Sequence, residues 1–170
     1  MQRAALIIAH DGFRDEEFFR PKEILEANGI EVSVVSSSII EAKGVLGSMV
    51  KPQILVKDVQ LKDFAAIIFV GGAGSSEYWD DPWARELAKE TFSSGKILAA
   101  ICIAPVTLAK AGVLKGRRVT VWPSEAAALL AAGADYTGHP VEKDGNIITA
   151  SGPDAAGEFA EVIVGELRKK

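Results

Sequence analysis

Short apolar runs alternate with amphipathic segments along most of the chain. The runs have the length and composition of buried strands, and they cover residues Ala4–Ala9, Glu31–Ser36, Ala65–Val70 and Lys96–Ile101. Apolar residues recur at helical spacing between these runs, and a glycine stop signal follows each of the predicted helices Glu16–Asn28, Asp81–Ser94 and Ala104–Ala111. Strands that alternate with helices form βαβ units, so we expect an α/β fold with a mostly parallel central sheet.

Two segments depart from this alternation. The stretch Ile39–Val56 is interrupted by glycine and proline and predicts a small β-hairpin excursion. The stretch Val141–Ala150 turns over Asp144 and Gly145, which is a strong hairpin signal. The last amphipathic segment, Ala155–Leu167, places its apolar residues along one stripe and is expected to pack on the sheet as a helix.

Composition indicates one globular domain over residues 1–170, because 48% of the residues are hydrophobic and 25% are charged. The formal charge is -4, from 19 Lys and Arg against 23 Asp and Glu, so no nucleic-acid partner is expected. No secretion signal is expected, because the first ten residues run almost directly into a strand pattern, and no apolar segment approaches membrane-spanning length. We therefore expect a cytoplasmic protein with no membrane contact.

The cysteine and histidine content limits the chemistry. One Cys and 2 His cannot form an internal disulfide or a Cys/His zinc cluster. No metal and no cofactor are expected. The candidate site therefore has to be sought among the loops at the carboxyl ends of the strands, where open α/β sheets bind ligands. These loops hold residues 10–17, 71–77 and 102–105.

Cys102 is the leading candidate for a catalytic group. It follows an apolar strand and precedes a helix, which resembles the nucleophile elbow of α/β enzymes. Backbone N–H groups and the helix dipole at this position favour the reactive thiolate. The alternative interpretation is that Cys102 is a small buried hydrophobic residue without chemical function.

Glu17 is the candidate partner of Cys102. In a helix that begins near Glu16 it shares a face with apolar residues, whereas Asp15 and Glu23 fall on more polar flanks. A buried carboxyl there would have a raised pKa and could exchange protons with the thiol. The sequence equally allows a solvated acid in a first helical turn, or a loop position if Pro21 marks the helix start.

Further residues of the strand-end loops could complete a pocket. Gly71 and Gly72 would let backbone N–H groups approach a ligand and, with the N–H of Ile103, hold an oxyanion, although a Gly-Gly pair also forms plain turns. The residues expected to line this pocket are His10, Gly71, Ala73, Trp122 and Pro153. His10 could serve as a base or a substrate contact, or be an ordinary loop histidine, whereas His139 is expected at the surface.

Four motifs taken together resemble those of the ThiJ/PfpI family, and the match covers nearly the whole chain. They are Gly12–Glu17, Val70–Gly72, Ala100–Pro105 and Thr149–Pro153. The resemblance implies a flavodoxin-like three-layer α/β/α sandwich that forms a homodimer. It also implies that Cys102 is the nucleophile, that Glu17 is its hydrogen-bonding partner, and that the N–H groups of Gly72 and Ile103 form the oxyanion site.

The resemblance has one informative departure. The residue after the cysteine is Ile103, where the peptidase-like branch of the family carries a histidine. The deglycase branch has a histidine close to its cysteine, in the region that Trp122 occupies here. The resemblance, whose family includes glutathione-independent glyoxalases and protein deglycases, implies a cysteine-dependent enzyme that converts reactive carbonyls such as methylglyoxal, or their early protein adducts, to lactate. One alternative is a redox sensor in which Cys102 becomes oxidised. A cysteine peptidase is less favoured, and a further alternative is an interaction protein in which the cysteine is inert.

Overall fold

A computed structural model describes residues 1–170 and contains a seven-stranded sheet in the order β11-β12-β8-β7-β1-β3-β6. Its strands are β1 (Arg3–Ile7), β3 (Glu31–Ser36), β6 (Ile54–Leu55), β7 (Ala66–Phe69), β8 (Ile97–Ile101), β11 (Val141–Asp144) and β12 (Ile147–Ala150). All neighbours pair in parallel except β11, which is antiparallel to β12. The predicted α/β fold with a mostly parallel sheet is confirmed.

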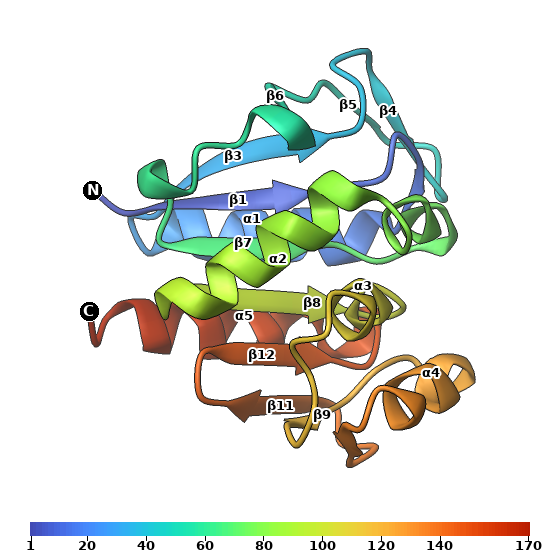
Figure 1. Ribbon diagram of the computed structural model, residues 1–170. Coiled ribbons are helices and arrows are strands. Elements are labelled where there is room, and N and C mark those ends of the chain that lie inside the picture. The colour runs from blue at the N-terminus through green and yellow to red at the C-terminus, as the bar shows by residue number, and fades with distance from the viewer.

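Helices cover both faces of this sheet. Figure 1 shows α2 (Pro82–Ser94) and α3 (Pro105–Lys110) in front of it, and α1 (Asp15–Ala27) and α5 (Ala156–Leu167) behind it. Successive strand residues point to opposite faces. In β1, Ala4 and Leu6 join the core under α1 and α5, while Ala5 and Ile7 join the core under α2 and α3. The sheet is therefore buried on both faces, which explains the continuous apolar runs in its strands.

Local signals in the sequence set the ends of the helices. Asp81 caps α2 by accepting a hydrogen bond of 2.8 Å from the N–H of Ala84, and Gly95 ends the helix with a left-handed φ of 78°. Helix α1 begins at Asp15, so the interpretation that Pro21 marks its start is wrong. Pro21 lies inside the helix and withholds the N–H that would otherwise bond the carbonyl of Glu17.

Two regions differ from the sequence-based expectation. The excursion at residues 39–56 is more than a hairpin: β4 (Ala42–Gly44) and β5 (Met49–Val50) form the hairpin, and β6 then joins the main sheet beside β3. Strand β2 (Asp11–Phe13) pairs with β4 in this small second sheet. The region before β11 holds the unpredicted elements β9 (Arg118–Val119), α4 (Ala126–Ala131) and β10 (Asp135–Tyr136).

The hairpin predicted over Asp144 and Gly145 is confirmed as β11–β12, and β12 continues the parallel sheet next to β8. As a result the carboxyl ends of β1, β7, β8 and β12 lie along one edge of the sheet, from which the loops of the candidate site emerge. None of the helices combines the length and the hydropathy that crossing a bilayer would require.

Candidate active site

Cys102 occupies a strained turn at the end of β8. Its φ of 66° makes it the only residue other than glycine with a positive φ. Such a conformation costs on the order of 1 kcal/mol or more and persists only where the surroundings enforce it. Here the Cys102 N–H donates to the carbonyl of Ala150 at 2.9 Å, and its carbonyl accepts from the N–H of Trp122 at 2.8 Å. The chain therefore has the nucleophile-elbow geometry that its sequence predicted, with a half-buried thiol.

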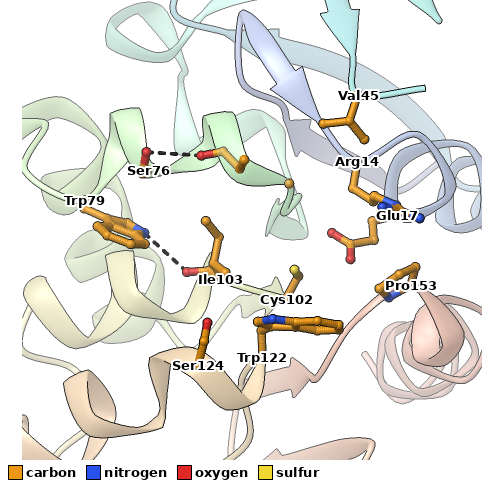
Figure 2. A pocket seen from close by; sticks show the side chains of 12 residues that line it. Arg14, Glu17, Val45, Ser76, Trp79, Cys102, Ile103, Trp122, Ser124 and Pro153 are labelled. Carbon is orange, nitrogen blue, oxygen red and sulfur yellow. Dashed lines mark hydrogen bonds between the residues drawn. The ribbon is translucent and has the colours of Figure 1, made fainter. Parts of the chain in front are cut away.

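Glu17 lies in the first turn of α1 and is fully buried, at 0% exposed. Figure 2 shows its carboxyl and the Cys102 sulfur facing the same space. Neither carboxyl oxygen makes a well-formed hydrogen bond, although the thiol and the backbone of Gly71 lie close enough to lower its pKa. The interpretation of Glu17 as a solvated acid is therefore wrong, and a buried, unpartnered carboxyl faces the only cysteine.

Gly71 allows these two side chains to meet. A Cβ built on Gly71 would lie 2.5 Å from Cβ of Cys102 and would overlap Oε1 of Glu17. Any larger residue would have to push the carboxyl or the cysteine out of place. Gly71 packs against both side chains and is not among the residues that line the cavity, where the sequence had predicted it.

Burial and mutual repulsion set the protonation of the pair. Burial raises the pKa of Glu17 to about 7, against the lowering influence of the thiol and of Arg14. Burial, followed by the Glu17 carboxylate, raises the pKa of Cys102 to about 12, whereas the N–H groups of Gly72 and Ile103 lower it. The expectation of a lowered thiol pKa is thus wrong, because burial and the carboxylate outweigh the amide groups. The pair keeps one proton between about pH 7 and about pH 12.

Gly72 brings a backbone N–H to the sulfur. It has a φ of 101°, and its carbonyl accepts a hydrogen bond of 2.9 Å from the N–H of Ser75. The N–H groups of Gly72 and Ile103 both interact with the sulfur of Cys102 and favour its anionic form. Two amide donors from different loops therefore converge on one atom, as a site that stabilises a developing oxyanion requires.

A cavity of about 490 Å³ opens in front of Cys102 and Glu17. Of the residues expected in its wall, Ala73, Trp122 and Pro153 line it, beside Gly72 and Ile103. Sequence reasoning missed further lining residues: Arg14, Val45, Ser76, Trp79 and Ser124. Arg14 and Ser76 belong to the strand-end loops expected at the site, whereas Val45, Trp79 and Ser124 come from segments whose approach to Cys102 depends on tertiary packing.

His10 lies outside the cavity, where the alternative of an ordinary loop histidine would place it. His10 follows β1 but is not among the lining residues of the cavity. Its backbone N–H donates to Oε2 of Glu77 at 2.8 Å, which ties it to the end of the 3-10 turn Ala73–Tyr78. His139 is at the surface as expected, with its Nδ1 2.6 Å from Oε1 of Glu142. Neither histidine is placed to act on the thiol.

Asp15 is a structural carboxylate that the sequence did not reveal. It was expected on a polar flank, but it is only 5% exposed, and it accepts hydrogen bonds from the N–H groups of Leu46 at 2.8 Å and Ser48 at 3.1 Å. Gly44 packs directly on it, since a Cβ there would lie 2.5 Å from both carboxyl oxygens. Asp15 thus fastens the β4–β5 turn to the start of α1.

Exchange of Asp15 for asparagine is expected to destabilise the protein by about 2 kcal/mol at neutral pH, because the amide cannot accept both hydrogen bonds. Burial would raise the pKa of Asp15, but its bonds with Ser48 and Leu46 lower it below the ordinary value. This stabilisation is therefore fully present above the ordinary carboxyl pKa of about 4 and is lost as the pH falls from there through the lowered pKa of the folded protein. Urea unfolding at pH 7 and at pH 3 should show the difference between the two proteins shrinking at the lower pH.

Fold and site together define a flavodoxin-like α/β protein with a cysteine at a nucleophile elbow and a buried glutamate facing it. The chain belongs to the DJ-1/PfpI family, whose model matches residues 2–166. The solved structure of a ThiJ/PfpI domain protein from Brachyspira murdochii superposes with a TM-score of 0.97 at 33% identity, over 99% of this chain and 97% of that one.

Curated relatives within the family carry different descriptions. An uncharacterized protein of Methanocaldococcus jannaschii is 42% identical over 98% of this chain and 83% of its own length. A deglycase of Pyrococcus abyssi is 34% identical, covering 87% of this chain and 89% of the relative. A glutathione-independent glyoxalase of Caenorhabditis elegans is 32% identical, covering 96% of this chain and 88% of the relative. Membership of the family therefore fixes the fold but leaves several activities open.

Proposed function

We propose that this protein is a cysteine-dependent enzyme that converts α-oxoaldehydes such as methylglyoxal to 2-hydroxy acids without glutathione. The observation that carries the proposal is the fully buried carboxyl of Glu17, which has a pKa near 7 and faces the thiol of Cys102. A group with this pKa can both donate and accept protons at neutral pH. The relatives named as a deglycase and a glyoxalase support the same class of substrate.

The first step is addition to the aldehyde. The sulfur of Cys102 attacks the aldehyde carbon, the carbon–oxygen π bond breaks, and the pair's remaining proton passes to that oxygen. The product is a hemithioacetal, and Glu17 is left as a carboxylate. In the proposed step the N–H groups of Gly72 and Ile103, which favour negative charge on the sulfur, stabilise the developing charge at the neighbouring oxygen.

The second step is a proton shift between adjacent carbons. The Glu17 carboxylate removes the hydrogen of the hemithioacetal carbon, the electrons move toward the neighbouring carbonyl, and its oxygen takes that proton from Glu17, which gives an enediol. The hydroxyl of the first carbon then loses its proton to Glu17, the first carbon regains its carbonyl, and Glu17 delivers the proton to the second carbon. The first carbon is oxidised by two electrons and the second is reduced by two, so the resulting thioester needs no external redox partner.

The last step is hydrolysis. Water adds to the thioester carbonyl, with Glu17 as the general base, and the carbon–sulfur bond breaks to release lactate and restore the thiol. The net reaction is methylglyoxal plus water giving lactate. Early adducts of methylglyoxal on proteins present the same carbons and are included in the proposed substrate class, which the name of the Pyrococcus relative supports.

The site offers less to a peptidase. Peptide hydrolysis by a thiol requires a base that also protonates the leaving amine, usually a histidine beside the cysteine. The residue after Cys102 is the apolar Ile103, and no histidine lines the cavity. The proton shift on an oxoaldehyde needs only one proton carrier between neighbouring carbons, which Glu17 can supply.

Turnover of methylglyoxal by the purified protein tests the proposal. We expect stoichiometric formation of lactate at pH 7 to 8 in the absence of glutathione, and none above background with Cys102→Ala. Absence of lactate formation by the unmodified protein, or equal formation by the alanine variant, would contradict the proposed activity.

A redox sensor is the second candidate, because the unpartnered carboxyl of Glu17 could share a proton with an oxidised sulfur. Two peroxide molecules would supply the two oxygens: the first converts the thiolate to a sulfenate and the second converts that to a sulfinate, with water as the by-product. The raised pKa of Cys102 limits the thiolate that starts this sequence. Intact mass after mild peroxide treatment distinguishes the candidates, since the sensor requires a stable addition of two oxygens that is absent in Cys102→Ala.

A further inference from the structure

The cavity is large and apolar for a three-carbon aldehyde. Its volume of about 490 Å³ falls in the range of sites that enclose much larger ligands. Most of its exposed surface is apolar, and Figure 2 shows Val45, Trp122 and Pro153 arranged around Cys102. Methylglyoxal bound at the sulfur would leave most of this apolar wall in contact with water.

One wall is a side chain that the fold holds in place. Val45 lies in the β4–β5 turn, and its N–H donates to the carbonyl of Phe13 at 2.9 Å. The following residues of the turn are fastened to the buried carboxylate of Asp15. Val45 is 44% exposed, yet its backbone is fixed by hydrogen bonds on both sides, so its side chain is a preorganised surface for a ligand.

The opposite wall is also held by packing. The ring of Trp122 lies against Gly152, where a Cβ would come within 2.8 Å of the ring. Trp79 donates from its indole nitrogen to the carbonyl of Ile103 at 3.3 Å. The only basic residue at the cavity, Arg14, is paired with Glu16 at 2.9 Å, which offsets its charge. An uncharged apolar group therefore suits this space better than an anionic one.

We propose that the preferred substrates are α-oxoaldehydes whose second carbonyl carries a bulky apolar group such as an aryl ring, and that Val45 is a specificity-determining residue for them. The preference among substrates rests on the proposed function, because it requires turnover. The apolar subsite can be tested without turnover. Filling an apolar pocket with additional carbon typically improves kcat/KM by about tenfold or more.

The catalytic test compares phenylglyoxal with methylglyoxal. We expect kcat/KM to be at least about tenfold higher for phenylglyoxal. Val45→Asp, which places a carboxylate in the wall, is expected to remove most of this preference. The matched control is Leu46→Asp in the same turn, because Leu46 is 64% exposed and does not line the cavity. Equal kcat/KM values for the two substrates, or the same loss in both variants, would overturn the inference.

A stoichiometric test separates the subsite from the reaction. Phenacyl bromide carries a phenyl ring where bromoacetone carries a methyl group, which is also the difference between phenylglyoxal and methylglyoxal. Each bromide alkylates Cys102 with loss of bromide. The ratio of their rate constants, divided by the ratio for N-acetylcysteine, reports the apolar subsite and is independent of the fraction of thiolate. We expect a value of about ten or more that falls in Val45→Asp and persists in Leu46→Asp. If this normalised ratio is about ten or more but neither aldehyde is turned over, the proposed activity is refuted and the apolar subsite is retained. A normalised ratio near one would refute the subsite.

Discussion

Exchange of Glu17 for glutamine is expected to lower kcat for methylglyoxal by about 10² to 10⁴-fold, the range that a positioned general acid–base typically contributes. Glutamine keeps the shape and the burial of the side chain but cannot carry a proton between the two substrate carbons. The hemithioacetal can still form on Cys102, so the loss should fall on the steps that follow addition. Lactate formation under saturating methylglyoxal measures the effect.

The same exchange should change the pH dependence of the thiol. In the unmodified protein the Glu17 carboxyl loses its proton near pH 7 while the thiol keeps its own to about pH 12, so alkylation of Cys102 by iodoacetamide should stay slow at neutral pH and rise only in strongly alkaline solution. In Glu17→Gln the carboxylate that helps to raise the pKa of the thiol is gone, and burial is left as the main influence that disfavours the thiolate. The midpoint of alkylation should therefore move downward from about pH 12.

Glu23→Gln is the matched control for both measurements. Glu23 is on the same helix, but its side chain is 74% exposed and faces away from the cavity wall, where it approaches Arg20. We expect it to leave both the turnover and the alkylation midpoint unchanged. An unaltered alkylation profile in Glu17→Gln would show that the carboxylate does not act on the ionisation of the thiol, and the proposed role of Glu17 would be withdrawn.

The fold could be predicted because its local and global signals agree. The strand at residues 31–36 and the helix that ends at Ser94 lie where their apolar runs and stop signals predict them. Cys102 could be placed on its elbow for the same reason, since a parallel strand must turn into the next helix at its carboxyl end. The segment from β9 to β10 gave no such signal, because its two-residue strands are too short to show a period.

Burial of carboxylates was harder to predict, as Asp15 and Glu17 show. Both lie in an acidic first turn that also suits a solvated helix start. Glu17 is buried because the Cys102 elbow lies across from it, and Asp15 is buried because the β4–β5 turn folds over it. These contacts join segments far apart in the sequence. The position of His10 also depends on such a contact, because its backbone N–H donates to Glu77 and it lies outside the cavity.

Gly72→Ala is expected to destabilise the protein by about 3 kcal/mol or more, the sum of backbone strain and overpacking. Gly72 has a φ of 101°, a region that residues with a Cβ rarely adopt. A Cβ there would lie 2.7 Å from the carbonyl carbon of Phe13 and would overlap the N of Arg14 and the O of Gly12. All three are backbone atoms, so no side chain can rotate to make room. The melting temperature should fall by about 10 °C for a chain of this size.

Gly165→Ala provides the control, because Gly165 lies inside α5 and a Cβ there meets nothing within 4 Å. That exchange is expected to stabilise the protein by about 0.5–1 kcal/mol, as alanine favours a helix interior. In Gly72→Ala, any folded protein should also show slower alkylation of Cys102 at neutral pH, because the displaced N–H of Gly72 no longer favours the anionic sulfur. Equal melting temperatures for Gly72→Ala and the unmodified protein would mean that the loop can relax around the added methyl group. The N–H of Gly72 would then not be rigidly held at the sulfur, and its part in stabilising the oxyanion would have to be abandoned.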